Sequence, residues 1–114
     1  MEFQHSTQAA GKWFELSLFE QLGNVGSEVG RARKWQNKNQ KVFENCFARA
    51  HELLMLTIAD PRWIEQAGEL CRVKEVLCDA YCGGALYNSD FVSLEKYFNH
   101  FAVAAQKRKL VHNL

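Results

Sequence analysis

Residues 23–35 read GNVGSEVGRARKW, and this stretch holds the first clue to how the chain folds. Its glycines stand three and four positions apart, inside an apolar pattern that has the period of a helix. Each glycine inside a helix costs roughly 1 kcal/mol relative to alanine. The stretch is therefore a broken helix, a phosphate-binding loop, or a helix that keeps one face bare so that another segment can approach it closely.

The phosphate-loop interpretation lacks its sequence context. A P-loop needs the pattern GxxxxGK[ST] directly after a strand, and a dinucleotide-binding fingerprint also follows a strand. Here the apolar positions continue through the glycines in register, as Leu18, Leu22, Val25, Val29 and Ala32. We therefore predict one helix over residues 12–36. Its glycines, Gly23, Gly26 and Gly30, would let a second helix from this chain or from another copy pack closely.

The composition is that of a folded helical domain. The chain has 114 residues, of which 47% are hydrophobic, with seven glycines and a single proline. A β-sandwich needs turn residues about every 8–12 positions, so this composition favours long helices. We expect a single domain over residues 1–114. We also expect a cytoplasmic location, because the sequence shows neither a signal peptide nor an apolar run of about 18 residues.

Turn and capping signals divide the chain into four helices, predicted over 12–36, 40–59, 61–82 and 90–109. Asp60 and Pro61 form an N-cap followed by proline at the first helical position. Gly83 and Gly84 are expected to end the third helix. Four helices with short connections predict an all-α fold, an up-down-up-down four-helix bundle.

The third predicted helix is apolar over roughly two-thirds of its circumference, more than a bundle monomer needs. The excess predicts that a second face of this helix is buried in a homo-oligomer. The residues assigned to close helix packing or to an intermolecular interface are Gly23, Gly26, Gly30, Val73, Val76 and Leu77.

Charged residues also recur at helical spacing. Their pattern allows either ion pairs that fix the register of the helices, which we favour, or a catalytic or metal site. The residues concerned are Glu28, Arg49, Glu52, Arg72, Glu75 and Asp79. A di-metal carboxylate bundle would need an E-x-x-H motif, which the chain lacks.

The four cysteines, Cys46, Cys71, Cys78 and Cys82, do not form paired zinc knuckles. We expect free, buried thiols in a reducing compartment, and neither a metal nor another cofactor.

Residues 31–41, RARKWQNKNQK, carry five basic side chains and no acidic one. A second basic cluster, at 107–109, should lie at the opposite end of the bundle. Basic side chains beside an aromatic ring are typical of nucleic-acid binding, whereas cations are also favourable at any helix C-terminus. The candidate RNA- or DNA-binding residues are Arg31, Arg33, Lys34, Trp35, Lys38 and Lys41.

Three segments resemble those of small bacterial four-helix-bundle proteins: NVGSEVGRA (24–32), RAHELLMLTIAD (49–60) and KYFNHFAVAAQ (96–106). This group includes the ribosomal-RNA intervening-sequence proteins and the Avd accessory proteins of diversity-generating retroelements. The resemblance covers length and helix layout over most of the chain. It implies an oligomeric bundle that binds nucleic acid and a partner protein such as a reverse transcriptase.

Three functional hypotheses follow. The first is a non-enzymatic oligomeric accessory protein that binds nucleic acid through residues 31–41. The second is a protein–protein interaction module without nucleic-acid binding. The third is a metal-dependent hydrolase or nuclease that uses the acidic residues Glu28, Glu52, Glu75 and Asp79.

Overall fold

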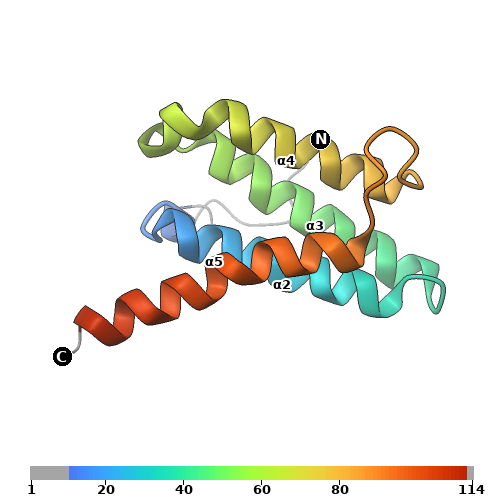
Figure 1. The fold of residues 1–114 in the computed structure, drawn as a ribbon, viewed down its shortest axis with the longest axis horizontal. Helices are drawn as coiled ribbons and strands as arrows, with labels where there is room; N and C mark the ends of the chain where they lie inside the picture. The colour runs from blue at the N-terminus through green and yellow to red at the C-terminus, as the bar shows by residue number, and fades with distance from the viewer. Residues whose placement is uncertain (1–10, 113–114) are drawn as a thin grey trace.

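The computed structural model describes residues 11–112, and this part of the chain is all-helical, with no strand. Four long helices pack together, and a 3₁₀ helix, η1, precedes the third of them (Figure 1). Their bounds are α2 Leu18–Trp35, α3 Gln40–Ala59, η1 Pro61–Gln66, α4 Ala67–Tyr81 and α5 Phe91–His112. The all-α prediction is confirmed. None of these helices has the length and hydrophobicity needed to span a membrane.

Helix α2 starts at Leu18, later than the predicted residue 12, because Ser17 caps it. The Ser17 hydroxyl accepts a hydrogen bond from the Glu20 N–H at 3.1 Å. The Glu20 carboxylate accepts one from the Ser17 N–H at 3.3 Å. This reciprocal pair is a capping box, and its S-x-x-E pattern is present in the sequence.

The predicted helix 61–82 is two elements. Asp60 caps the first turn by accepting from the Arg62 N–H at 3.0 Å, and Pro61 follows it, as the sequence predicted. That turn is a 3₁₀ helix, and Trp63 within it has non-helical backbone angles that mark a kink before α4 begins at Ala67. The glycine stop is confirmed: Gly83 and Gly84 have φ values of +108° and +79°, which favour glycine.

Consecutive long helices run in alternating directions, and α2 lies at the centre of the arrangement (Figure 1). It packs along most of its length against both α3 and α5. Helix α4 packs on α3 but barely touches α5, so the α4–α5 seam is open. Helix α5 runs to His112, beyond the predicted residue 109, and its C-terminal end projects past the other helices.

The glycine face of α2 packs against α5 of the same chain. A Cβ atom placed on Gly26 would lie 2.5 Å from Phe98 Cβ, and one on Gly23 would lie 3.1 Å from Ala102 Cβ. Gly30 is covered by the side chain of Glu95. The glycines therefore serve close helix packing, as predicted, and of the two partners that the sequence left open it is a helix of the same chain that they contact.

The core is built from the apolar residues that recur at helical spacing in the sequence. Val25 and Val29 of α2 are fully buried, as are Leu54 of α3 and Phe98 of α5. Leu77 of α4 is also fully buried. The excess apolar arc of the third predicted helix is thus partly explained within one chain.

One assignment to an intermolecular interface is consequently wrong: Leu77 is fully buried in the chain's own core. Val73 is also part of that core but lines the pocket at the α4–α5 seam. Val76 is half-buried and remains partly accessible. The cysteine prediction also needs correction: the thiols are free, but Cys82 is exposed and only Cys46 is fully buried.

An aromatic cluster fastens α3 to α4 and to the start of α5. The rings of Phe47 and Tyr81 stack with centroids 4.1 Å apart. Phe43 contacts Tyr81 at 5.7 Å and meets Phe91 edge-on at 5.2 Å. These contacts compensate for the absence of close packing along the rest of the α4–α5 seam, because they tie both helices to α3.

The close α2–α5 contact gives a stability prediction. Gly26→Ala should destabilise the fold by about 1–3 kcal/mol, because the new methyl group collides with Phe98 and outweighs the helix-propensity gain. Gly68→Ala is the matched control, since a Cβ there would meet no neighbouring segment within 4 Å. It should raise the free energy of unfolding by up to about 1 kcal/mol. Urea unfolding of both variants measures the difference, and equal effects would contradict the packing account.

Candidate functional site

The basic run lies where α2 ends and α3 begins. Arg31, Arg33, Lys34 and Trp35 occupy the last turns of α2, and residues 36–39 reverse the chain. The reversal depends on Asn37, whose φ is +66°, and on Asn39, which caps α3 by accepting from the Val42 N–H at 3.2 Å.

Lys38 lies in this turn and Lys41 in the first turn of α3. The structure therefore gathers all six predicted nucleic-acid residues at one end of the molecule.

The two arginines of this end are paired and the three lysines are not. Arg31 bonds the Glu28 carboxylate at 2.8 Å, and Arg33 Nε bonds the Glu95 carboxylate at 2.9 Å. Within residues 11–112, no ion pair involves the lysines of the run, Lys34, Lys38 and Lys41. Unpaired, exposed ammonium groups are available to an external anion.

An aromatic ring stands among these cations. Trp35 is 37% exposed, although it is a large apolar side chain. The Lys34 ammonium lies 6.0 Å from the centroid of its ring. A partly exposed indole beside cations offers a flat surface on which a nucleic-acid base can stack.

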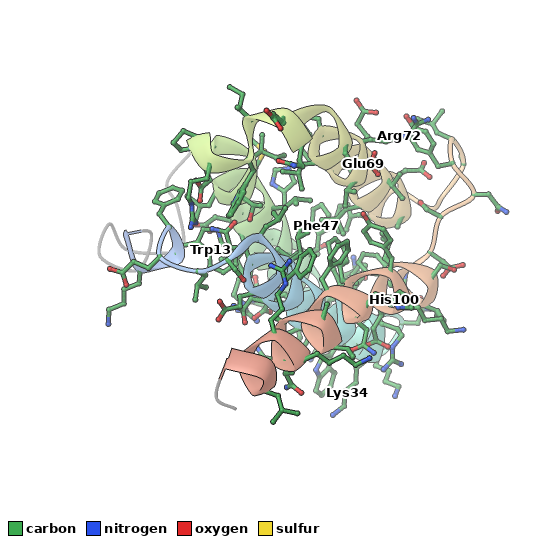
Figure 2. All side chains as sticks on the ribbon, turned by 60° about the vertical axis from the view of Figure 1, so that its left-hand side comes forward. Trp13, Lys34, Phe47, Glu69, Arg72 and His100 are labelled. Atoms are coloured by element: carbon green, nitrogen blue, oxygen red, sulfur yellow. The ribbon has the colours of Figure 1, made fainter. Side chains whose placement is uncertain are left out.

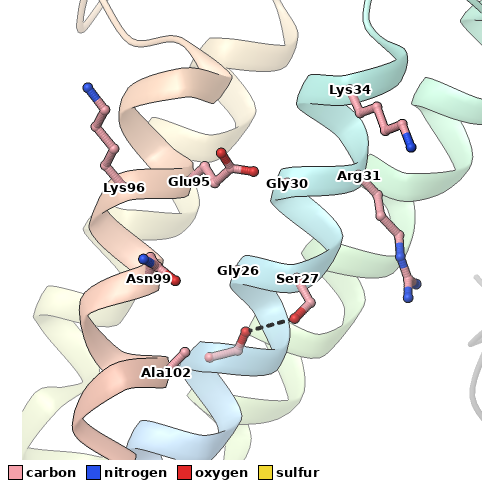
Figure 3. A pocket seen from close by; sticks show the side chains of 10 residues that line it. Gly26, Ser27, Gly30, Arg31, Lys34, Glu95, Lys96, Asn99 and Ala102 are labelled. Atoms are coloured by element: carbon pink, nitrogen blue, oxygen red, sulfur yellow. Dashed lines mark hydrogen bonds between the residues drawn. The ribbon is translucent and has the colours of Figure 1, made fainter.

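A groove of about 470 Å³ continues from this end along the α2–α5 contact (Figure 3). Its floor contains the glycines of α2, and Arg31 and Lys34 line it from the same helix. Lys96 and Asn99 line it from α5. Neither α5 residue was identified from the sequence, because only the packing of α5 on α2 brings them beside residues more than 60 positions away.

The second basic cluster lies at the other end of the α2–α5 pair, as predicted. The Arg108 guanidinium stacks on the Phe19 ring, 4.6 Å from its centroid. Phe19 is in the first turn of α2, whereas Trp35 ends that helix. With a rise of 1.5 Å per residue, the two ends are about 24 Å apart along the helix axis.

The predicted charged network is divided between two places. Glu28 on α2 pairs with Arg49 on α3 at 3.2 Å, as well as with Arg31. Glu52 is buried on α3. Glu75 and Asp79 instead face the loop after α4, and Arg72 lies on the exposed side of that helix.

The acids of the hydrolase hypothesis are therefore not brought into one site. Among the residues that the structure describes, no three His, Cys, Asp or Glu side chains are placed to hold a metal ion.

Asp79 holds the loop between α4 and α5. Its carboxylate accepts hydrogen bonds from the N–H groups of Leu86 and Tyr87, both at 2.9 Å, and from the Ser89 hydroxyl at 2.8 Å. Burial acts to raise the pKa of Asp79, but these hydrogen bonds outweigh it and hold the pKa below its usual value. Glu75 adds a 3.0 Å bond from the Tyr87 hydroxyl. Both acids thus have a structural task.

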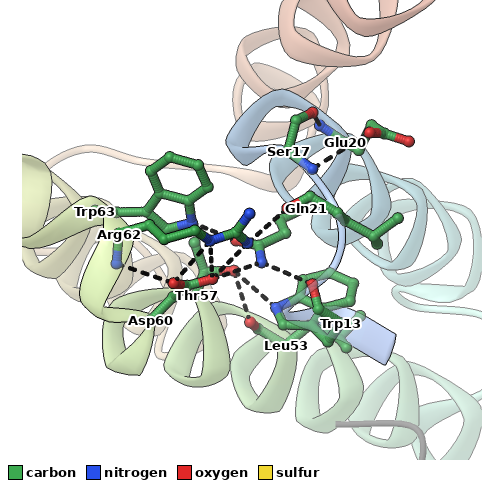
Figure 4. A network of polar contacts seen from close by, with 10 residues as sticks. Trp13, Ser17, Glu20, Gln21, Leu53, Thr57, Asp60, Arg62 and Trp63 are labelled. Atoms are coloured by element: carbon green, nitrogen blue, oxygen red, sulfur yellow. Dashed lines mark hydrogen bonds and ion pairs between the residues drawn. The ribbon is translucent and has the colours of Figure 1, made fainter. Parts of the chain in front are cut away.

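A buried polar cluster that sequence reasoning missed joins α2, α3 and η1 (Figure 4). The Gln21 amide donates to the Trp13 carbonyl at 2.9 Å and to the Asp60 carboxylate at 3.2 Å, and it accepts from the Trp63 indole at 2.9 Å. The Trp13 indole donates to the Thr57 hydroxyl at 3.2 Å. Periodicity cannot reveal such a cluster, because its members come from four separate segments.

Arg62 closes this cluster over Asp60. Its guanidinium pairs with the carboxylate at 2.7 Å, donates to the Leu16 carbonyl at 2.7 Å and stacks on the Trp63 ring. The hydrogen bond from Arg62 holds the pKa of Asp60 below its usual value, against the opposing effect of burial. Both carboxylate oxygens of Asp60 are thus engaged within the chain, which indicates a structural role.

The lowered pKa of Asp60 predicts a pH-dependent contribution to stability. That contribution is present above the unfolded-state pKa of about 3.9 and is lost as the pH falls through the lower folded-state pKa. Asp60→Asn should therefore be less stable than the wild type by about 1.5–3 kcal/mol at pH 7, and the difference should shrink below about pH 4. Glu65→Gln, an exposed change in η1, is the control. Thermal unfolding from pH 7 to pH 3 measures the stability difference between Asp60→Asn and the wild type. A stability difference that stays constant over this range would contradict the prediction.

An apolar pocket of about 290 Å³ opens at the α4–α5 seam. Val73 and Val76 line it from α4, and Leu94 and Tyr97 line it from α5. Its polar rim consists of Glu69, Arg72, Ser89, Asp90 and Ser93. Figure 2 shows Glu69 and Arg72 on α4, with His100 on α5 across the seam.

Comparisons with known proteins find no matching family model, no matching curated protein and no matching solved structure. The resemblance to the four-helix accessory proteins therefore stays a prediction.

Proposed function

We propose that the chain is a non-enzymatic accessory protein that binds the phosphate backbone of single-stranded nucleic acid. The binding surface is the basic end, residues 31–41, continued by the α2–α5 groove. The observation that carries this proposal is Lys34, which makes no ion pair with any described residue and lies 6.0 Å from the partly exposed ring of Trp35, with the likewise unpaired Lys38 and Lys41 close by in the sequence. Phosphate neutralisation by lysine and arginine supplies most of the affinity of non-specific nucleic-acid binding.

The residues that line the groove favour this proposal over the alternative that the basic side chains only stabilise the solvent-exposed end of α2. Cations at the end of α2 are favourable to its dipole whatever their function. That explanation covers Arg33 and Lys34, which lie in the last turn. It does not cover Lys96, which lies in the second turn of α5 and lines the groove from the opposite side.

A single strand fits this surface better than a duplex. The exposed Trp35 ring can receive an unpaired base, whereas the bases of a duplex are already stacked. The groove begins beside Lys34, the neighbour of Trp35 in the sequence, and extends along α2 to Gly23, toward the end where Arg108 stacks on Phe19. A flexible backbone can follow the whole of this path, which runs along one helix pair.

Binding should depend steeply on salt and on the unpaired lysines. The double variant Lys34→Gln/Lys38→Gln should weaken binding of a fluorescein-labelled oligothymidylate and reduce the slope of log K against log salt by about 1–2. Lys74→Gln on α4 removes one positive charge away from this end and is the control. Fluorescence anisotropy at several salt concentrations measures both quantities.

Trp35→Ala distinguishes stacking from charge. It should weaken binding by about 1–3 kcal/mol and leave the salt slope unchanged, because no charge is removed. Wild-type protein that does not bind the oligothymidylate at low salt would refute the proposed function.

We also propose that the chain forms a homodimer, with an up-down-up-down bundle in each copy and the open α4–α5 seam at the interface. The seam exposes an apolar pocket beside Tyr97, which is 36% exposed. Its rim carries both Arg72 and the acids Glu69 and Asp90, so a copy related by a two-fold axis can place acid opposite arginine. The resemblance stated above implies a reverse transcriptase as a further partner, which co-purification would test.

Light scattering tests the dimer directly. Wild-type protein should give the mass of two chains, and Tyr97→Asp should give one, because it places a charge in the apolar pocket. Val103→Asp introduces the same charge at an exposed position of α5 that does not line the pocket, and should remain dimeric. A wild-type mass of one chain at all concentrations would refute this interface.

A further inference from the structure

We propose that the Glu95 carboxylate occupies the position of a phosphate group in the α2–α5 groove, and that a bound strand must displace it. Glu95 then sets the affinity of the groove by competing with the ligand for Arg33. This inference depends on the proposed nucleic-acid function and adds a residue that controls it.

The geometry places Glu95 inside the groove. Its Oε1 accepts from Arg33 Nε at 2.9 Å, and its Oε2 lies against the bare backbone of Gly30. In Figure 3 the carboxylate points from α5 toward Gly30 on α2. Among the described residues that line the groove, Glu95 is the one acid, beside the cations Arg31, Lys34 and Lys96. An anion of the chain itself thus lies where the basic groove attracts external anions.

The Arg33–Glu95 pair is suited to exchange. A carboxylate and a phosphate present similar oxygen acceptors to a guanidinium group, so one can replace the other on Arg33. The pair is accessible to solvent, since the Arg33 side chain is 41% exposed and the Glu95 side chain 35%. Exposed ion pairs of this kind contribute little stability, and opening one leaves the core intact.

Gly30 makes room for the carboxylate. A Cβ at this position would collide with Glu95 Oε2 where it now lies, so the bare backbone of glycine gives the carboxylate room at the helix surface. Gly23 and Gly26 differ from Gly30, because α5 backbone or core atoms cover them. Of the three glycines, Gly30 is therefore the one beside which a ligand oxygen can replace a side-chain oxygen.

The first test is Glu95→Gln. The amide keeps a hydrogen-bond acceptor for Arg33 but loses the negative charge, so oligothymidylate should bind about threefold to tenfold more tightly at low salt. Glu65→Gln, which removes the same charge in η1, should leave the affinity unchanged. Circular dichroism melting of each variant checks that the fold is kept. Unchanged or weaker binding by a folded Glu95→Gln protein would overturn the inference.

A second measurement uses the wild-type protein, so it does not depend on the variant's stability. The Arg33 Nε–H group gives a side-chain signal in ¹H–¹⁵N NMR spectra, and its partner in the free protein is Glu95. Titration with oligothymidylate should shift this signal as phosphate replaces carboxylate. A signal that stays in place at saturation would overturn the inference while the proposed function stands. Wild-type protein that binds no oligothymidylate would remove both.

Discussion

The close contact between the glycine face of α2 and α5 is the constraint on which the rest of the structure depends. Because Gly26 has no side chain, Phe98 can reach the α2 backbone and remain fully buried. This contact makes α2 the central helix, since its opposite side packs along α3. It also fixes the register of α5, so that Glu95 meets Gly30 and Arg33.

The two ends of α2 are used in opposite ways. At its start, polar groups are buried and satisfied within the chain: Gln21 bridges α2 to Asp60, and Arg62 closes the cluster. At its end, Lys34 and Lys38 make no ion pair with any described residue, and Trp35 is partly exposed. Buried polar groups with complete hydrogen bonding specify a fold, whereas unpaired exposed groups are available to a ligand. This contrast supports a functional surface at the α2–α3 end of the molecule.

The open α4–α5 seam follows from the same central role of α2. Helix α5 packs closely on α2, and α4 is held by α3 and by the stacking of Tyr81 on Phe47. The two outer helices are therefore joined mainly through their shared neighbours and through the loop that Asp79 anchors. An apolar pocket beside Tyr97 remains between them, which is the type of surface that a second protein covers.

The sequence by itself determined the all-helical fold, the central apolar seam, the Asp60–Pro61 start and the glycine stop after α4, because these depend on local periodicity, capping and backbone freedom. It also located the basic run, whose residues are neighbours along the chain. Only the tertiary structure decided that the glycines face α5, that Lys96 joins Lys34 in one groove, and that Asp79 holds a loop. These features depend on which helices become neighbours. That choice is made by side-chain packing between segments far apart in the sequence, and local sequence patterns do not encode such packing.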